Sequence, residues 1–337
     1  MLFTMPSAIG SAIRNAHRKR REQRPRPQRT ALLLSGGGNL SVFHLGVIEV
    51  LLENKLMPKV VSGASAGSLT AAMIGTRSDR ALHALLRDKR GLLSLADKPI
   101  TGPVTSERYR AYLATLIPDV TFAQAEKISG RAINISVSAH NGSGGLVCGP
   151  RTTPNVLVRD AVLASCAVPS VFEPVMLRQR VGRKVVPFRG RQRWVDGSIF
   201  ADVPARFIKR HYRVRHTNVS MVNPVARPFL SDRERADQRL GDRSLMYLVR
   251  ASALGWLSMG RACAGSFPRV RETLDFAHRV LRQDYRGDMV LTPSKRFFPL
   301  AEVMNKPTKT TMLRLATDGK VRTRARLDEL KTFAGTQ

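Results

Sequence analysis

The stretch from Val60 to Leu69 (VVSGASAGSL) constrains the fold of this chain more than any other. Its β-branched start is typical of a strand end, and the apolar run Leu69 to Ile74 is typical of a helix. Between them, Gly63 and Gly67 flank Ser65 in the pattern Gly-x-Ser-x-Gly. A tight strand-to-helix turn of this kind, a nucleophile elbow, aims its serine hydroxyl at the positive end of the helix. The pattern also occurs by chance in many chains, so the prediction of Ser65 as a nucleophile needs support from elsewhere.

A second strand-to-helix junction lies just before the elbow. Ala31 to Ser35 is a short apolar run typical of a buried parallel strand, and Val42 to Leu52 carries apolar residues at helical spacing. Gly36, Gly37 and Gly38 connect the two. Because glycine has no Cβ, its backbone N–H can approach an anion closely, and the helix dipole adds to the attraction. The junction is therefore a predicted anion site.

Two common uses of such a glycine loop do not fit. A dinucleotide-binding fold needs an acidic residue at the end of the next strand, which is absent, and Ser41 stands where the last glycine of its fingerprint would be. A P-loop needs Gly-Lys followed by Ser or Thr, which is also absent. Since adjacent parallel strands end at the same edge of a sheet, we expect the glycine loop to lie beside Ser65 as an oxyanion hole.

Trp194 to Ser198 (WVDGS) supplies a candidate base. Asp196 stands at a strand end, and Gly197 allows a sharp turn after it, although Asp-Gly is also an ordinary turn signal. A carboxylate within hydrogen-bond reach of Ser65 can take its proton directly if a desolvated cleft raises the carboxyl pKa above the usual value of about 3.9. A two-residue Ser-Asp arrangement is therefore one possibility, although on its own the Asp-Gly pair favours an ordinary turn.

A histidine base is the main alternative within hydrolases. His211, His216 and His278 follow Asp196 and could complete a Ser, Asp, His order, but none lies in a Gly/Pro-rich loop at a clear strand end. His140 lies in a predicted turn between two strands, where a lone histidine is usually solvated. A histidine-assisted α/β-hydrolase esterase remains open on the sequence alone.

The charge balance suggests an anionic partner. The chain has 56 Lys and Arg against 25 Asp and Glu, a formal net charge of +31, which attracts anionic membranes or nucleic acid. Few aromatic residues lie among the arginines as stacking platforms for bases, so nucleic acid is the less favoured partner. The run Arg178 to Arg193 predicts a basic hairpin that could contact lipid headgroups. A non-catalytic basic lipid-binding protein is thus a second alternative.

The N-terminal tail, the lengths of the apolar runs and the cysteines indicate the cellular compartment. Residues 1–30 form a basic, Pro- and Arg-rich tail that we expect to be disordered, ahead of a single domain at 31–331. The order of charged and apolar residues in the tail is wrong for a secretory signal, and no apolar run is long enough to span a bilayer. Cys148, Cys166 and Cys263 show no metal spacing, so we expect free thiols. These features favour a cytoplasmic protein that contacts a membrane only peripherally.

The order of these motifs resembles that of the patatin-like phospholipase family, and most closely its branch of triacylglycerol lipases. The matching segments are SGGGNLSVFHLGVIEVLL, SGASAGSLTAAMIG, ASCAVPSVFEPV, WVDGSIFADVPARFIKRHYRVRHTNVSMVNP and YRGDMVLTP. The resemblance implies a three-layer α/β fold with a mainly parallel central sheet flanked by helices. It also implies Ser65 as nucleophile and Asp196 as base, with Gly36, Gly37 and Gly38 as the oxyanion loop. The implied substrate is a lipid acyl ester, either triacylglycerol or glycerophospholipid, and no metal or cofactor is implied.

Two departures from the family pattern stand out. Asn39, Leu40 and Ser41 replace the last three positions of the usual Gly-Gly-Gly-x-Arg-Gly, so the arginine of that motif has no counterpart. Asp-Gly-Ser replaces the commoner Asp-Gly-Gly or Asp-Gly-Ala but keeps Gly197. His44 and Cys166 also match the branch, and we interpret both as packing residues.

Overall fold

The computed structural model describes residues 30–87, 105–169, 171–227, 251–261 and 268–283, and all of 285–335 except 286, 296, 300, 301 and 304–306. Residues 1–29 of the tail predicted at 1–30, as well as Cys263, lie outside the described residues. The division into a tail and a domain at 31–331 stays a prediction.

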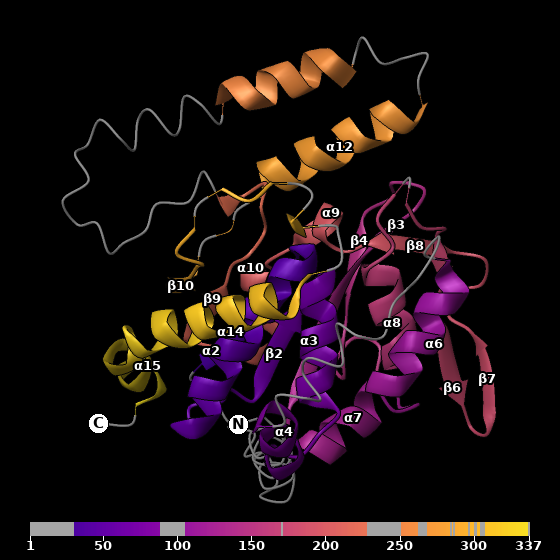
Figure 1. Ribbon diagram of the computed structural model, residues 1–337. Helices are drawn as coiled ribbons and strands as arrows, with labels where there is room; N and C mark the ends of the chain where they lie inside the picture. The colour runs from indigo at the N-terminus through magenta and orange to yellow at the C-terminus, as the bar shows by residue number, and fades with distance from the viewer. Residues whose placement is uncertain are drawn as a thin grey trace, which may run out of the picture.

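A mixed sheet forms the centre of the protein (Figure 1), with the strand order β10-β9-β1-β2-β3-β8-β5 and with β4 paired to β3. The strands from β10 to β3 in this order run parallel to one another, whereas β8, β5 and β4 pair antiparallel. The strands are β1 (Thr30–Leu34), β2 (Val60–Gly63), β3 (Ala132–Ala139), β4 (Gly145–Cys148), β5 (Val175–Met176), β8 (Arg193–Asp196), β9 (His216–Ser220) and β10 (Met289–Leu291).

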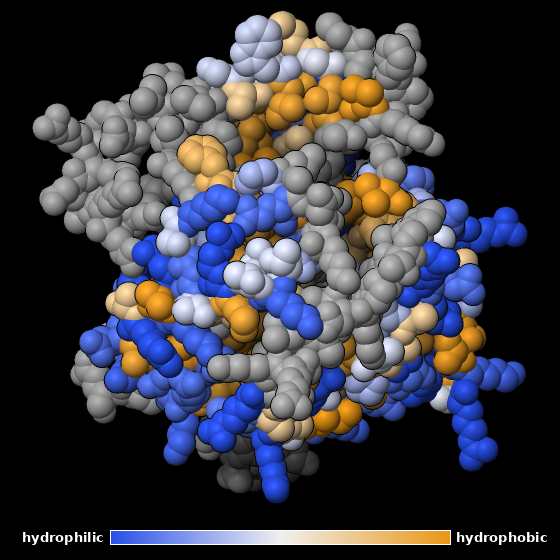
Figure 2. All heavy atoms as spheres, in the orientation of Figure 1, coloured by the Kyte–Doolittle hydropathy of each residue, from blue (hydrophilic) through white to orange (hydrophobic). Residues whose placement is uncertain are grey.

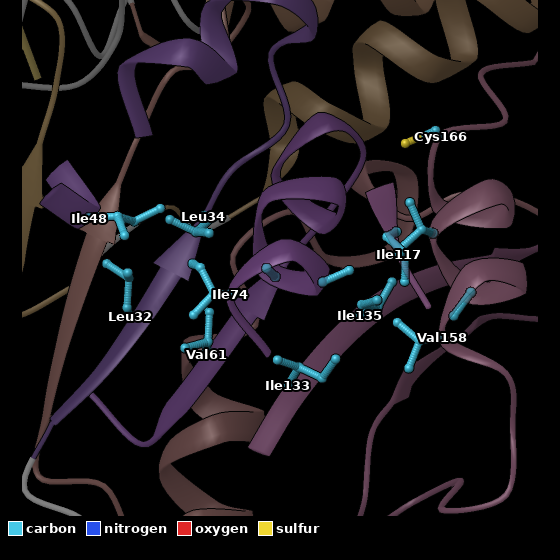
Figure 3. Close-up of a cluster of buried hydrophobic side chains, with 14 of the residues drawn as sticks. Leu32, Leu34, Ile48, Val61, Ile74, Ile117, Ile133, Ile135, Val158 and Cys166 are labelled. Carbon is cyan, nitrogen blue, oxygen red and sulfur yellow. The ribbon is translucent and has the colours of Figure 1, made fainter. Parts of the chain in front are cut away.

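Helices cover both faces of the sheet, which explains the continuous apolar run of β1. Leu32 and Leu34 pack into a cluster shared with α2 (Val42–Glu53), α3 (Ala66–Gly75) and α8 (Val158–Ser165). Figure 3 shows Leu32 and Leu34 beside Ile74 of α3 and the neighbouring strand residues. Ala31 and Leu33 point the other way, into a cluster with Ile208 and Tyr212 of α10 (Ala205–Tyr212). The predicted three-layer α/β fold with a mainly parallel sheet is therefore confirmed.

The remaining elements surround this framework. α14 (Lys309–Arg324) packs along α2 so closely that a side chain on Gly46 or Gly319 would strike the backbone of the facing helix. The predicted basic hairpin is present as β6 (Arg178–Val181) and β7 (Lys184–Pro187). The other elements are η1 (Gly38–Ser41), α4 (Asp79–Arg87), α6 (Ser106–Leu116), α7 (Phe122–Ser129), α9 (Ser198–Ala201), α12 (Pro268–Arg282), α14 (Lys309–Arg324) and α15 (Leu327–Ala334). None of the described helices is long and apolar enough to cross a membrane.

The pairing of β3 brings two strand ends together. Along one edge of β3, Gly63 at the end of β2 pairs with Ile135, and Asp196 at the end of β8 pairs with Val137. β4 pairs with the same stretch of β3 and so takes the opposite edge. Because β2 runs parallel and β8 antiparallel to β3, the carboxyl ends of β2 and β8 face each other. The chain that leaves β2 therefore enters α3 next to Asp196.

Candidate active site

Ser65 stands at the elbow between β2 and α3 in the backbone conformation that the sequence pattern predicts. Its φ of 48° and ψ of −129° lie in a region that non-glycine residues rarely adopt. Two serines fix this geometry: the Ser65 N–H donates to Ser165 Oγ at 2.9 Å, and Ser68 Oγ donates to the Ser65 carbonyl at 2.6 Å. The half-buried side chain of Ser65 is thus held at the N-terminus of α3.

The elbow glycines are required by close backbone contacts. A Cβ on Gly63 would strike the carbonyl of Gly67, and a Cβ on Gly67 would strike the carbonyl of Leu34 at the end of β1. A Cβ on Gly197, after Asp196, would strike the carbonyl of Ser136. A larger residue at any of these positions would push apart the elements that surround Ser65.

The glycine loop after β1 lies directly against the elbow. A Cβ on Gly36 would lie 2.9 Å from Ser65 Cβ and 2.7 Å from Ser198 Oγ. The Gly36 N–H donates to Asp202 Oδ1 at 2.6 Å, so this group is occupied in the structure. No described residue accepts a hydrogen bond from the N–H of Gly37 or Gly38. Of the three glycines of the predicted oxyanion loop, Gly36 thus anchors the loop, and only the N–H groups of Gly37 and Gly38 are without an acceptor among the described residues.

Asp196 is fully buried at the end of β8. Its Oδ1 accepts from the Ser198 N–H at 2.7 Å, whereas Oδ2 has no hydrogen-bond partner of ordinary geometry among the described residues. Burial raises the pKa of Asp196 to about 6, and interactions with the Ser65 hydroxyl and with Ser198 partly offset this rise. The structure thus brings Ser65 and Asp196 together, with a carboxylate oxygen left open beside the serine.

Asp202, which the sequence analysis did not single out, holds the glycine loop in place. Besides the bond from Gly36, Oδ1 accepts from Ser198 Oγ at 3.2 Å, and Oδ2 accepts from Asn223 Nδ2 at 2.8 Å. Burial raises the pKa of Asp202 to about 7, and these hydrogen bonds lower it again in part. Its own N–H donates to the side chain of Gln283 at 2.7 Å. Asp202 therefore links four segments of the chain around Ser65.

The charge of Asp196 acts on two neighbouring groups, Tyr109 and Cys166, of which the sequence analysis named only Cys166. Burial raises the pKa of the Cys166 thiol to about 12 and that of the Tyr109 phenol well above 10, and the charge of Asp196 raises both further. The Cys166 Sγ lies 3.8 Å from Ser68 Oγ. Both groups stay protonated at neutral pH, in keeping with the interpretation of Cys166 as a packing residue rather than a reactive one.

The candidate histidine bases have other contacts. His216 begins β9 at the amino edge of the sheet and stacks on Phe333, and the exposed His211 contacts the Phe207 carbonyl of its own helix. His278 on α12 contacts Ser258 and Arg261, each at 3.2 Å. None of these contacts involves Ser65 or Asp196.

Two further histidines, His140 and His44, were singled out in the sequence. His140 is exposed on the turn between β3 and β4. His44 is buried between Ser220 Oγ at 2.7 Å and the Ser35 carbonyl at 3.0 Å, and burial lowers its pKa to about 4. It is therefore a neutral packing residue, as predicted. Among the described residues there is no group of three or more His, Cys, Asp and Glu side chains that could hold a metal ion.

Comparisons with known proteins relate the chain to one family. The model of the patatin-like phospholipase family matches residues 32–208. The chain is 30% identical to triacylglycerol lipase SDP1L of Arabidopsis thaliana, over 92% of this chain and 41% of that protein. It is 30% identical to triacylglycerol lipase ptl3 of Schizosaccharomyces pombe, over 86% of this chain and 64% of that protein. A patatin-like phospholipase domain-containing protein of Meyerozyma guilliermondii is 32% identical, over 83% of this chain and 44% of that protein. The chain thus spans less than two thirds of the length of these relatives.

Among solved structures, the chain is similar to the crystal structure of VipD from Legionella pneumophila. The TM-score is 0.51 at 14% sequence identity, over 90% of this chain and 67% of that one. At this identity the similarity concerns the fold alone.

Proposed function

Because the chain belongs to the patatin-like phospholipase family, we propose that it hydrolyses acyl esters of lipids with Ser65 as nucleophile and Asp196 as its general base. The observation that carries the proposal is the meeting of two strand ends along β3. It places a buried carboxylate with one open oxygen beside a serine in a strained elbow. A strained backbone conformation and a buried carboxylate oxygen without a hydrogen-bond partner both cost folding free energy. Such features cluster at active sites, where they are part of the mechanism.

In the proposed first step, Asp196 Oδ2 takes the proton of Ser65 Oγ as that oxygen attacks the ester carbonyl. The N–H groups of Gly37 and Gly38 stabilise the negative charge on the carbonyl oxygen, and the N-terminus of α3 adds to the effect. The proton then passes from Asp196 to the oxygen of the departing alcohol as its bond to the acyl carbon breaks. The acyl group stays bound to Ser65. In the second half, Asp196 activates a water that releases the fatty acid and restores the serine.

The surroundings of Asp196 suit this role. A general base works best when its pKa lies near the working pH, and burial raises that of Asp196 to about 6. The bond from the Ser198 N–H to Oδ1 turns the other oxygen toward Ser65. Each step uses only groups of the chain and water.

The substrate we propose is a water-insoluble acyl ester, triacylglycerol or glycerophospholipid. Two of the relatives are named triacylglycerol lipases, which favours the first. The net charge of +31 favours an anionic lipid surface, and thereby the second. The difference between these substrates lies in the third group on glycerol, not in the bond that is cleaved, so the same dyad serves for both.

The test is release of nitrophenol from a short-chain nitrophenyl ester by the wild type, Ser65→Ala and Asp196→Asn. Circular dichroism checks that each variant folds. Ser143→Ala and Asp119→Asn change the same residue types at exposed positions and should keep wild-type activity. Activity in folded Ser65→Ala would rule out the nucleophile. A folded wild type that turns over neither short esters, dispersed triacylglycerol nor phosphatidylcholine would overturn the proposed function.

A further inference from the structure

Two antiparallel helices cover the site end of the sheet. Residues 251–261 form the first helix, and α12 the second. Ser258 and Arg261 of the first helix contact His278 of α12, Arg261 also pairs with Asp275, and Gly260 lies close to Leu274. Figure 1 shows this helical pair above α9, beyond the main body of the sheet and its helices.

The helical pair exposes large apolar side chains. Trp256 is 71% exposed, Met259 57% and Val270 51%. Figure 2 shows orange, hydrophobic side chains gathered on these helices at the top of the molecule. Single exposed apolar residues are normal on a soluble protein, but a group of them on one pair of helices marks a contact surface.

Basic residues lie on the same pair of helices. The segment 251–261 contains no acidic residue. Arg279 and Arg282 of α12 are exposed, and no described acidic side chain pairs with either. Together with His278, Gln283 and Phe200, they line a hollow of about 420 Å³ between α12 and α9. This combination of exposed tryptophan and unpaired arginines complements a surface with an apolar interior and anionic headgroups.

The helical pair is tied to the turn that carries the candidate base. The Gln283 side chain accepts from the Asp202 N–H at 2.7 Å and donates to the Ser198 carbonyl. Ser138, which lines the same hollow, donates to the Asp196 carbonyl at 2.6 Å. A lipid aggregate bound to the helical pair would therefore lie next to the site that its ester must reach.

We propose that the helical pair is the surface by which this protein rests on a bilayer containing anionic phospholipids. Trp256 and Met259 enter the interface between headgroups and acyl chains, where aromatic side chains are favoured, and Arg279 and Arg282 contact lipid phosphates. The inference builds on the proposed function, since an enzyme acting on lipid esters must meet its substrate in an aggregate. Its test is nevertheless independent of catalysis.

The test uses the full chain with Ser65→Ala, so that vesicles are not consumed. The chain has two tryptophans, and Trp194 is only 2% exposed, so a change in fluorescence on binding reports on Trp256. Vesicles of phosphatidylcholine with a fraction of phosphatidylglycerol should shift the emission to shorter wavelength and sediment with the protein. Vesicles of phosphatidylcholine alone should do so much less, and salt should weaken the effect.

Paired substitutions locate the surface. Trp256→Ser and Met259→Ser should each weaken binding about tenfold, because each removes apolar area from the interface. Val321→Ser on α14 is the matched control, since Val321 is 57% exposed, as Met259 is, but lies on another part of the molecule. Added to an otherwise wild-type chain, these three changes should leave hydrolysis of a soluble nitrophenyl ester unchanged.

Three results would overturn the inference. In the first, Trp256→Ser and Met259→Ser bind anionic vesicles as tightly as the parent chain. In the second, Val321→Ser weakens binding as much as they do. In the third, Trp256 resists a soluble quencher before any vesicle is added, which would mean that another part of the chain covers it. A protein that binds vesicles through Trp256 but cleaves no ester would refute the proposed function and leave this inference standing.

Discussion

Asp196 and Asp202 lie on either side of the short helix α9, and both are buried. Their carboxylate oxygens differ in the hydrogen bonds that they accept. Asp196 keeps one oxygen without an ordinary hydrogen-bond partner, next to Ser65. Both oxygens of Asp202 accept hydrogen bonds, from Gly36, Ser198 and Asn223. An open oxygen in a desolvated position is available to take a proton, whereas a saturated one holds its neighbours in place. The comparison supports the proposed role of Asp196 in proton transfer and points to Asp202 as the residue that positions the glycine loop.

The largest expected effect is the loss of activity in Asp196→Asn. General-base catalysis contributes about 10²–10⁴-fold, so hydrolysis of a soluble ester should fall by at least that range. The free energy of unfolding should rise at the same time, by about 1–3 kcal/mol at pH 8, because burial raises the carboxyl pKa from 3.8 to about 6 and the neutral amide avoids burying a charge. Chemical denaturation measures this change. An inactive variant that is also less stable would show that Asp196 is mainly structural.

Asp202→Asn should have a smaller effect of a different kind. The amide keeps one acceptor, but its NH₂ group must face a donor from either Gly36 or Asn223. Asn223 cannot simply turn over, because its Oδ1 already accepts from the N–H groups of Val225 and Ala226. The glycine loop should shift, and kcat should fall about 10- to 100-fold, because small displacements of oxyanion donors are costly.

The pH profile separates the two variants. Asp202→Asn still contains the proposed base, so its remaining activity should rise with pH as that of the wild type does. The remaining activity of Asp196→Asn should not depend on pH over the same range. Asp119→Asn, at an exposed position, controls for the change of residue type. The comparison fails if both variants lose the pH dependence.

The third expected effect concerns pH in the wild-type protein. A base must be deprotonated to act, so kcat/KM for a soluble ester should be low below an apparent pKa of about 6 and reach a plateau above it. The contribution of the Asp196 and Asp202 carboxyl groups to folding stability changes with pH in the opposite direction. Since both buried carboxyls have folded-state pKa values above that of free aspartate, their contribution to stability is fully present below about pH 4 and is lost as pH rises through 6 to 7. Kinetics that stay flat down to pH 4.5 would exclude Asp196 as the base.

The sequence was sufficient to predict the fold class and the local geometry around Ser65. Continuous apolar strands next to amphipathic helices indicate a buried parallel sheet, and small residues on both sides of Ser65 indicate an elbow; both arise from neighbours in the chain. The role of Asp202 could not be predicted in this way. Its bond to Gly36 joins residues 166 positions apart, and nothing in the spacing of either residue indicates the other.

The direction of β8 also depends on pairing between residues far apart in the chain, so the sequence could not predict it. Asp-Gly after a strand is an ordinary turn signal, and only the antiparallel pairing of β8 with β3 turns Asp196 toward the end of β2. The family resemblance implied Asp196 as the base, whereas the residues alone left the histidines open. The resemblance likewise implied Gly36, Gly37 and Gly38 together as the oxyanion loop, and nothing in the sequence indicated the long-range bond from the Gly36 N–H to Asp202.

The smallest expected effect is that of His278→Ala, which tests whether an open carboxylate oxygen is a sufficient sign of the base. Of the three candidate histidines, His278 is the one that lines the same hollow as Ser138 and Gln283, which contact the segment from Asp196 to Asp202. Its ring contacts Ser258 and Arg261, and burial together with the neighbouring arginines lowers its pKa. Hydrolysis of a soluble ester should therefore stay within about twofold of the wild type, with His211→Ala as the exposed control. If His278→Ala folds and loses activity as Asp196→Asn does, then the histidine takes the proton and Asp196 only orients it. In that case the free oxygen of Asp196 would accept a hydrogen bond from the His278 ring only after substrate binding moves that ring toward it. The difference between Asp196 and Asp202 would then reflect this hydrogen bond and not the transfer of a proton from Ser65 to Asp196.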